Sequence, residues 1–277
     1  MNYTDSSRSN RSIPVKIYYP AEASGDNQPF AGEDGTRYPV FVFGHGFTIS
    51  IGNYQYLGEY LAARGFIVAM VDTEGGFLPN HTNFGKDLAF VTDRLQVDGA
   101  TPSSPLFGRV GEKTAVGGHS MGGGASYLAP QYSANITALV TFAAANTNPS
   151  SIDAAATITL PSMVIAASND KVAPPSSNQG PIFTALASSC KLLVTETNGS
   201  HCNYAPDSFT CSFGEGTVCI GCSFMDGDLQ REIALEAAAN WLAYTLQDCA
   251  DGLTALEDYL LAQSGEGNVT YTEDCTP

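Results

Sequence analysis

The sequence predicts an α/β fold in which a mostly parallel central sheet is covered by helices on both faces. Short apolar runs typical of buried strands alternate with longer helical patterns, and a parallel sheet with crossover helices requires this alternation. The 277 residues, 43% of them hydrophobic, suit one domain. We therefore expect a single domain over residues 1–277, with a core at about 11–247 and a disulfide-closed tail at about 248–277.

The expected strands and helices succeed one another in this alternating order. An early strand over residues 13–20 is placed at or near a sheet edge, because Pro14 has no N–H group to donate to a neighbouring strand. Further strands are predicted at residues 39–43, 66–72, 114–117, 138–142, 162–167 and 191–197, and helices at 53–64, 84–98, 123–128 and 229–246. No insertion before residue 200 is long enough for a lid domain, and residues 202–222 form the one long irregular segment.

The pentapeptide Gly118-His119-Ser120-Met121-Gly122 carries the strongest chemical signal in the chain. It follows an apolar run and precedes small, helix-compatible residues, which is the strand–turn–helix context of a nucleophile elbow. The glycines on either side of Ser120 leave room for a tight turn that exposes its hydroxyl. The alternative interpretation is a Gly/Ser loop that matches the pattern by chance.

The order of the remaining chemical groups predicts the rest of a catalytic triad. After such an elbow, an acid and then a histidine follow, each at the end of a later strand. His201 is the only one of the four histidines downstream of Ser120, and Asp170 lies in the exit loop of the strand expected at 162–167. Serine needs a base to take its proton, and the acid holds the imidazole in the required tautomer. The alternatives are a turn-capping role for Asp170 and a surface position for His201.

Two backbone amides are expected to form an oxyanion hole. One is the N–H of Met121, which directly follows the nucleophile, and the other belongs to the loop after an early strand. Residues 44–48 follow the strand expected at 39–43, so the N–H of Phe47 is the second predicted donor. We interpret His45 and His119 as packing residues, because the triad already has its base.

Charge and hydropathy restrict the partners of the chain. The formal net charge of −16, from 28 acidic and 12 basic residues, argues against binding to nucleic acid or to an anionic membrane surface. No run of 18 or more apolar residues predicts a membrane span. The first 20 residues lack the apolar region of a signal peptide, so we expect Met1 to be a start residue placed on a mature sequence from which a leader was removed.

Cysteine usage predicts a secreted, extracellular protein with a disulfide-stapled C-terminal region. We expect Cys249 to pair with Cys275 around a polar tail, and one thiol of the odd number to be free or paired between chains. Zinc binding around Cys219 and Cys222 is the alternative, but exported enzymes more often oxidise such cysteines, so no metal and no cofactor is expected. All seven cysteines lie in the last third of the chain: Cys190, Cys202, Cys211, Cys219, Cys222, Cys249 and Cys275.

Residues 118–124, 169–174 and 200–201, together with an early Gly-Phe-Thr turn, resemble bacterial cutinases and polyester hydrolases, the PET-hydrolase group. Residues 11–20 and 44–47 are more similar to the neighbouring branches of chlorophyllase, platelet-activating-factor acetylhydrolase and dienelactone hydrolase. The resemblance covers roughly residues 11–247. It implies a lidless α/β-hydrolase fold with Ser120, Asp170 and His201 as triad and with Phe47 and Met121 as oxyanion donors.

The chain departs from these relatives at two places. Polyester hydrolases of that group carry a tryptophan just after the strand that follows the elbow, whereas residues 142–147 here hold none and the single tryptophan is Trp241. An aromatic platform for substrate is therefore expected from Phe47, with Phe77 and Tyr204 as the other candidates. The second departure is Cys202, directly after His201, where a disulfide would rigidify the loop or act as a plain structural staple. A serine nucleophile disfavours the cysteine chemistry of dienelactone hydrolases.

These observations lead to the hypothesis of a monomeric, secreted serine carboxylic-ester hydrolase that acts through an acyl-enzyme. A shallow cleft without a lid suits bulky or polymeric esters, so insoluble polyesters such as PET are candidate substrates. The first alternative is a general small-ester or lipid esterase without real polymer activity. The alternative from another class is a noncatalytic binding module on a hydrolase scaffold, against which the intact triad argues.

Overall fold

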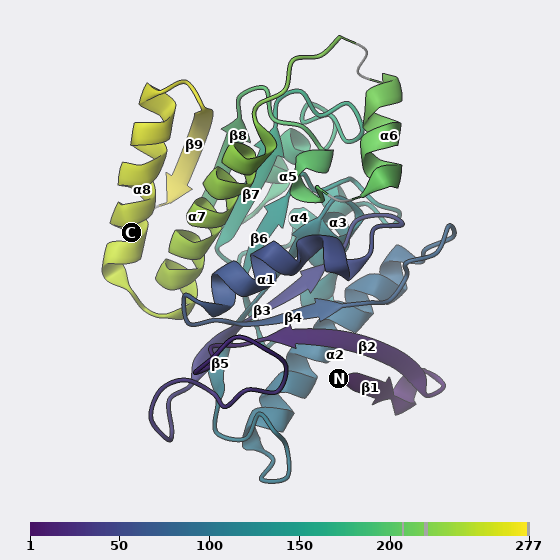
Figure 1. Cartoon of the computed structure of the whole chain (residues 1–277). Helices are drawn as coiled ribbons and strands as arrows, with labels where there is room; N and C mark the ends of the chain where they lie inside the picture. Colours follow the sequence, from purple (N-terminus) through teal and green to yellow (C-terminus); the bar gives the residue numbers. More distant parts are fainter. Residues whose placement is uncertain (207, 219–220, 276–277) are drawn as a thin grey trace.

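The computed structural model describes residues 1–206, 208–218 and 221–275, without the side chain of residue 250. In this part of the chain nine strands form one sheet in the order β1-β2-β4-β3-β5-β6-β7-β8-β9 (Figure 1). The six strands from β3 to β8 run parallel to one another, whereas β1, β2 and β9 pair antiparallel with their neighbours. The strands are β1 Asn2–Asp5, β2 Arg11–Tyr18, β3 Tyr38–Gly44, β4 Ile67–Val71, β5 Val110–His119, β6 Ile136–Phe142, β7 Ser162–Ala167, β8 Cys190–Glu196 and β9 Val269–Cys275.

Helices cover both faces of this sheet, which confirms the predicted fold class. On one face, apolar side chains of α1 and α7 pack on the strands, and α8 packs against α7 and β9. On the other face lie α2, α3, α4 and α5. The helices are α1 Gln55–Ala62, α2 His81–Ala100, α3 Met121–Leu128, α4 Ser151–Ala155, α5 Gln179–Ala185, α6 Phe209–Val218, α7 Gly227–Leu246 and α8 Ala250–Gly265, with short 3₁₀ turns η1 Ser6–Arg8, η2 Ile51–Tyr54, η3 Ala129–Gln131 and η4 Cys202–Tyr204.

Strand β3 shows how the two faces share the core. Its side chains alternate, so Phe41 and Phe43 join the cluster under α1 and α7, whereas Val40 and Val42 join the cluster under α2 and α3. All four side chains are fully buried, as expected for a central parallel strand. The sequence predicts this strand correctly, because a strand buried on both faces appears as an unbroken run of apolar residues.

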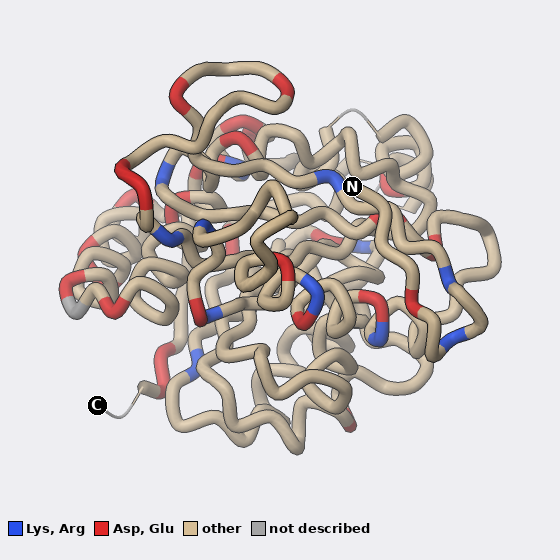
Figure 2. The backbone as a smooth tube through the Cα atoms, turned by 90° about the horizontal axis from the view of Figure 1, so that it is seen from below, with Lys and Arg blue, Asp and Glu red and all other residues tan. Residues whose placement is uncertain are grey.

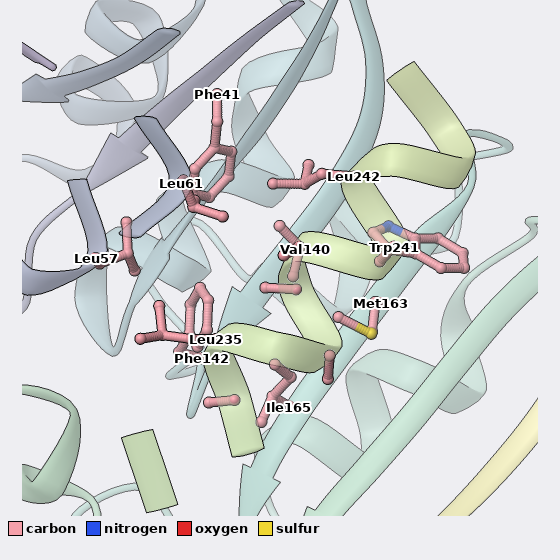
Figure 3. Close-up of a cluster of buried hydrophobic side chains, with 14 of the residues drawn as sticks. Phe41, Leu57, Leu61, Val140, Phe142, Met163, Ile165, Leu235, Trp241 and Leu242 are labelled. Carbon is pink, nitrogen blue, oxygen red and sulfur yellow. The ribbon is translucent and has the colours of Figure 1, made fainter. Parts of the chain in front are cut away.

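Trp241 lies inside this core. Its ring is fully buried, and its Nε1–H donates to the carbonyl oxygen of Leu139 at 3.0 Å. Figure 3 shows Trp241 on α7 among side chains of the sheet, including Val140 and Met163. The one tryptophan of the chain therefore stabilises the packing of α7 on β6 and is not available to a substrate.

The C-terminal region differs from the expected polar tail. Residues after 247 form α8 and then β9, which pairs antiparallel with β8 at the sheet edge. This register places Cys275 opposite Cys190, and the two form a disulfide. The predicted pair between Cys249 and Cys275 is therefore wrong, and Cys249 is an exposed free thiol. The strand escaped prediction because Val269-Thr-Tyr-Thr-Glu-Asp-Cys is an edge strand with a largely polar outer row.

One further segment differs from expectation, and one agrees with it. Part of the stretch predicted to be irregular, residues 202–222, forms α6, and Cys202 is joined there to Cys211 by a disulfide. Strand β1 extends the sheet beyond β2, so Pro14 lies one strand away from the edge, in agreement with the expected position at or near a sheet edge. Its carbonyl oxygen accepts a hydrogen bond from Asp72 N–H.

Acidic residues occur along most of the chain and outnumber Lys and Arg on the backbone tube (Figure 2). Among the described residues, no helix combines the length and the apolar character that crossing a bilayer would need.

Candidate active site

Ser120 sits on a sharp turn between β5 and α3. Its backbone has a φ of 53° and a ψ of −117°, a conformation that non-glycine residues rarely adopt and that the surrounding structure must hold in place. The turn is held by Ser120 N–H, which donates to Phe142 O at 3.0 Å, and by Ser120 O, which accepts from Gly124 N–H and Ala145 N–H at 2.9 Å each. The predicted strand–turn–helix geometry is therefore present around Ser120.

The structure brings the three predicted triad side chains together. His201 Nε2 lies 2.9 Å from Ser120 Oγ, and His201 Nδ1 lies 2.6 Å from Asp170 Oδ2. All three residues are buried, with Ser120 the most accessible at 8% exposure. They come from the ends of β5, β7 and β8, which meet at the carboxyl edge of the parallel sheet.

Asp170 is anchored on its own loop as well as on the histidine. Its Oδ1 accepts hydrogen bonds from Val172 N–H at 2.8 Å and from Ala173 N–H at 2.7 Å. The turn-capping role considered as an alternative is therefore real, and it coexists with the contact to His201. Because a carboxylate only accepts, His201 Nδ1 carries the proton and Nε2 is left to accept from the serine hydroxyl.

The two predicted oxyanion donors belong to residues that line the cleft beside Ser120. Met121 is the first residue of α3, where an N–H group has no partner within the helix. Phe47 follows β3, and both residues line the same cleft as Ser120. This arrangement is the one an oxyanion hole needs, and the roles of the two amides remain predictions.

His119 and His45 are both fully buried, in agreement with a packing role. His119 Nδ1 lies 2.8 Å from Tyr54 Oη, which also accepts from Gly46 N–H at 3.0 Å. His119 Nε2 lies 3.1 Å from the carbonyl oxygen of His201. Burial, and then the nearby His201, lower the pKa of His119 well below its usual value, so the ring is neutral. Tyr54 belongs to no recognisable sequence motif, because its contact with His119 depends on how η2 approaches β5 in space.

The loop that carries His201 is held by two side chains that sequence reasoning also missed. Gln230 on α7 accepts from Ser200 N–H and donates to Ser200 O, both at 2.9 Å. Glu215 on α6 accepts from His201 N–H at 2.7 Å. Both side chains are buried. Buried polar groups are nearly always hydrogen-bonded, but their burial depends on how α6 and α7 dock, so no local sequence pattern points to these two residues.

An open cleft of about 500 Å³ lies beside Ser120. Phe77 and Leu78 project from the loop before α2 with 82% and 97% of their surfaces exposed, and Phe47 faces Phe77 across 6.5 Å between ring centres. The segment where related polyester hydrolases are expected to carry tryptophan contributes small and polar side chains here. The cleft is lined by Phe47, Phe77, Leu78, Pro79, His81, Ser120, Met121, Ala145, Asn146 and Thr147.

Tyr204 does not line this cleft, so its predicted contact with substrate is wrong. The side chain is 1% exposed, and its ring packs against the rings of His119 and Phe142. Its hydroxyl donates to Glu196 Oε2. The short turn η4 directs the residue inward, next to His119, which a count along the chain could not show.

A zinc site around Cys219 and Cys222 would also draw on the nearby Cys202 and Cys211. These two are joined in a disulfide and so cannot act as thiolate ligands, and Cys219 lies outside the described residues. In the part of the chain that the structure describes, no group of three or more His, Cys, Asp or Glu side chains is placed to hold a metal ion.

Comparison with known proteins places the chain in a family. A family model described as PET hydrolase-like matches residues 7–240. Bis(hydroxyethyl) terephthalate hydrolase of Streptomyces coelicolor is 28% identical over 217 residues, which are 78% of this chain and 63% of that relative. Cutinase est1 of Thermobifida alba is 28% identical over 213 residues, 76% of this chain and 65% of that relative. The matches thus span slightly less than two thirds of these two relatives.

Cutinase 2 of Thermobifida cellulosilytica is 24% identical over 234 residues, which are 82% of this chain and 86% of that relative. The family match covers the elbow, the acid loop and the histidine loop described above, and with them most of the sheet. The resemblance expected from the motifs is therefore confirmed: the chain belongs to the PET hydrolase-like family and has the α/β-hydrolase fold.

Proposed function

We propose that this protein is a serine ester hydrolase of the cutinase and polyester-hydrolase type. The observation that carries the proposal is the continuous hydrogen-bonded series from Ser120 Oγ through His201 to Asp170, next to an open cleft. Family membership and the names of the relatives, a terephthalate-ester hydrolase and cutinases, support the same reaction class.

In the first half of the reaction, Ser120 Oγ attacks the ester carbonyl carbon and its proton passes to His201 Nε2. The negative charge that develops on the carbonyl oxygen is stabilised by the N–H groups of Phe47 and Met121. Asp170 stabilises the imidazolium. The tetrahedral intermediate then expels the alcohol, which takes the proton from His201 and leaves an acyl group on Ser120.

In the second half, water replaces the alcohol and His201 again acts as general base. Water attacks the acyl carbon, the same two amides hold the oxyanion, and the carboxylic acid leaves as Ser120 regains its proton. This cycle needs no cofactor, because every proton is held by His201 and every charge by backbone amides or Asp170.

We extend the proposal to bulky and polymeric esters. The cleft is open, and the exposed rings of Phe47 and Phe77 offer an apolar platform in place of the missing tryptophan. The rival is a small-ester or lipid esterase, which the small and polar segment 145–147 favours. A noncatalytic binding module is disfavoured, because binding alone needs no serine–imidazole–carboxylate series.

The disulfides Cys190–Cys275 and Cys202–Cys211 support a secreted protein, since such bonds persist in oxidising compartments. Activity of the native gene product in the medium, with little inside the cells, is the expected distribution. Accumulation of active enzyme within a reducing cytosol would overturn this part of the proposal.

The function is tested by hydrolysis of p-nitrophenyl butyrate beside amorphous polyester film, with Ser120→Ala as the control. We expect wild type to turn over the soluble ester and the variant to do so about 10⁶-fold more slowly. The melting curve of the variant should be nearly the same as that of wild type. Soluble acid products from the film would support the polymer substrate. Turnover of the soluble ester alone would support the small-ester rival, and no difference between wild type and variant would refute Ser120 as nucleophile.

A further inference from the structure

Helix α6 buries one side chain, and that side chain is a carboxylate. Among the ten residues of α6, Glu215 is the buried one, at 4% exposure, whereas Phe209 and Phe213 are 79% and 64% exposed. An amphipathic helix ordinarily packs through an apolar stripe, and a carboxylate is among the groups least suited to burial. The inward face of α6 is therefore organised around a carboxyl group.

Among the described residues, the hydrogen-bond donors to Glu215 come from the loop that carries His201. Oε1 accepts from His201 N–H at 2.7 Å, and Oε2 accepts from Cys202 N–H at 3.2 Å and from the hydroxyl of Ser200. A disulfide joins Cys202 to Cys211 one helical turn before the carboxylate, so α6 and the loop are linked covalently as well. The three donors offset the cost of burying the polar oxygens of Glu215.

With these contacts, every polar atom of His201 has a partner that restrains it. Its N–H donates to Glu215 and its carbonyl oxygen lies 3.1 Å from His119 Nε2. Its two ring nitrogens face Asp170 and Ser120. The side chain of a histidine has two rotatable bonds, so its Nε2 can be directed at Ser120 Oγ only if the backbone that carries it is fixed.

We propose that Glu215 is a positioning residue for the ester hydrolysis. It holds the peptide group of His201 so that the imidazole keeps its orientation toward Ser120 while it cycles between neutral and protonated forms. The proposal rests on the proposed function in naming the reaction, but the restraint itself is a property of the loop. Misplacement of a catalytic group by about 1 Å costs about 100-fold in rate.

The test compares Glu215→Ala and Glu215→Gln with Thr217→Ala, a control at an exposed position on the same helix. For Glu215→Ala we expect kcat on p-nitrophenyl butyrate to fall about 100-fold, with KM changed by no more than about twofold. Glu215→Gln keeps one oxygen that accepts from His201 N–H, but its NH₂ group would face Cys202 N–H, so that two donors lie against each other. Its kcat should fall only about 3- to 10-fold, a partial rescue. Thr217→Ala should keep the wild-type kcat.

Proton NMR supplies a readout that does not require turnover. The far-downfield resonance of the proton between His201 Nδ1 and Asp170 reports the orientation of the ring. We expect it in wild type and in Thr217→Ala, and we expect it to broaden or disappear in Glu215→Ala. If Glu215→Ala does not fold, Glu215→Gln carries both measurements, with a weakened resonance and the smaller loss of kcat expected.

Folded variants at position 215 with wild-type kcat, or with an unchanged resonance, would overturn the proposal, because Glu215 would then only stabilise the loop. If wild type itself hydrolyses no ester, the proposed function fails. The resonance in Glu215→Ala or Glu215→Gln still decides the positioning role, so the two failures are distinguishable.

Discussion

His119 and His201 contact each other next to Ser120: His119 Nε2 lies 3.1 Å from the carbonyl oxygen of His201, and the two ring centres are 4.7 Å apart. Because burial keeps His119 neutral, it can donate through Nε2 while Nδ1 accepts from Tyr54. Tyr54 in turn accepts from Gly46 N–H, one residue before the predicted oxyanion donor Phe47. One buried series of hydrogen bonds therefore connects the loop of His201 with the loop that precedes Phe47.

Tyr54→Phe tests this connection. Loss of the hydroxyl leaves Gly46 N–H and His119 Nδ1 buried without a partner, which should lower the free energy of unfolding by about 2–4 kcal/mol. We also expect a lower kcat, because the loop of Phe47 loses an anchor. Urea denaturation and steady-state kinetics check both effects, with the exposed Tyr132→Phe as control. Unchanged stability and unchanged kcat together would show that the series has no role.

Gly122→Ala tests the close approach of the elbow to the backbone at the end of β3. A Cβ at this position would lie 2.2 Å from the carbonyl carbon of Gly44, a backbone atom that cannot move aside cheaply. We expect a loss of about 3 kcal/mol or more of stability together with loss of activity. Gly214→Ala is the matched control, because the position lies in α6 with no atom within 4 Å of the added carbon. It should stabilise the protein by up to about 1 kcal/mol, as measured by thermal melting. A melting temperature of Gly122→Ala equal to that of wild type would contradict the geometry.

Phe77→Ala tests the aromatic platform. The side chain is 82% exposed, so its removal should change the free energy of unfolding by less than about 0.5 kcal/mol. Turnover of p-nitrophenyl butyrate should stay near wild type, while KM for large aromatic esters and product release from polyester film should worsen. Phe107, half-exposed and outside the cleft, provides the control substitution to Ala. Equal effects of the two substitutions on film hydrolysis would count against a platform at Phe77.

Glu196 makes the stability of the fold depend on pH. Burial raises the pKa of this carboxyl to about 8, against an ordinary value of 4.5, and Tyr204 donates to it. Between pH 4.5 and 8 the folded state thus keeps a proton that the unfolded state has released, so the free energy of unfolding falls as the pH rises through this window. Glu196→Gln cannot release that proton. Its stability should be close to that of wild type near pH 4.5 and exceed it at pH 8 by a few kcal/mol, on the order of 3–5.

Calorimetric melting of wild type and Glu196→Gln at several pH values provides the measurement. Glu112→Gln, at an exposed position on β5, serves as the control for removal of a carboxylate. A difference between Glu196→Gln and wild type that does not change from pH 4.5 to pH 8 would refute the raised pKa.

Local sequence patterns predict the strands and the turn that position the candidate site, because each depends on a short segment. The runs at 39–43, 66–72 and 162–167 are apolar, and residues 40–43, 66–71 and 162–167 are buried in the structure. The elbow was recognised because its turn imposes glycines within two residues of the serine. His201 and Asp170 followed from chain order, since each must sit at the end of a later strand. The predictions failed where a residue's role depends on what lies opposite it in space.

The sequence by itself determined the α/β class, the serine at the elbow and the order of the triad candidates, because hydrophobic periodicity and turn chemistry act over a few residues. Only the tertiary structure decided that Cys190, and not Cys249, faces Cys275, that Tyr204 points into the core, and that Glu215 caps the His201 loop. These outcomes depend on strand register and helix docking, which bring together residues up to 85 positions apart. Such contacts are selected by packing of the whole domain, so no short stretch of sequence encodes them.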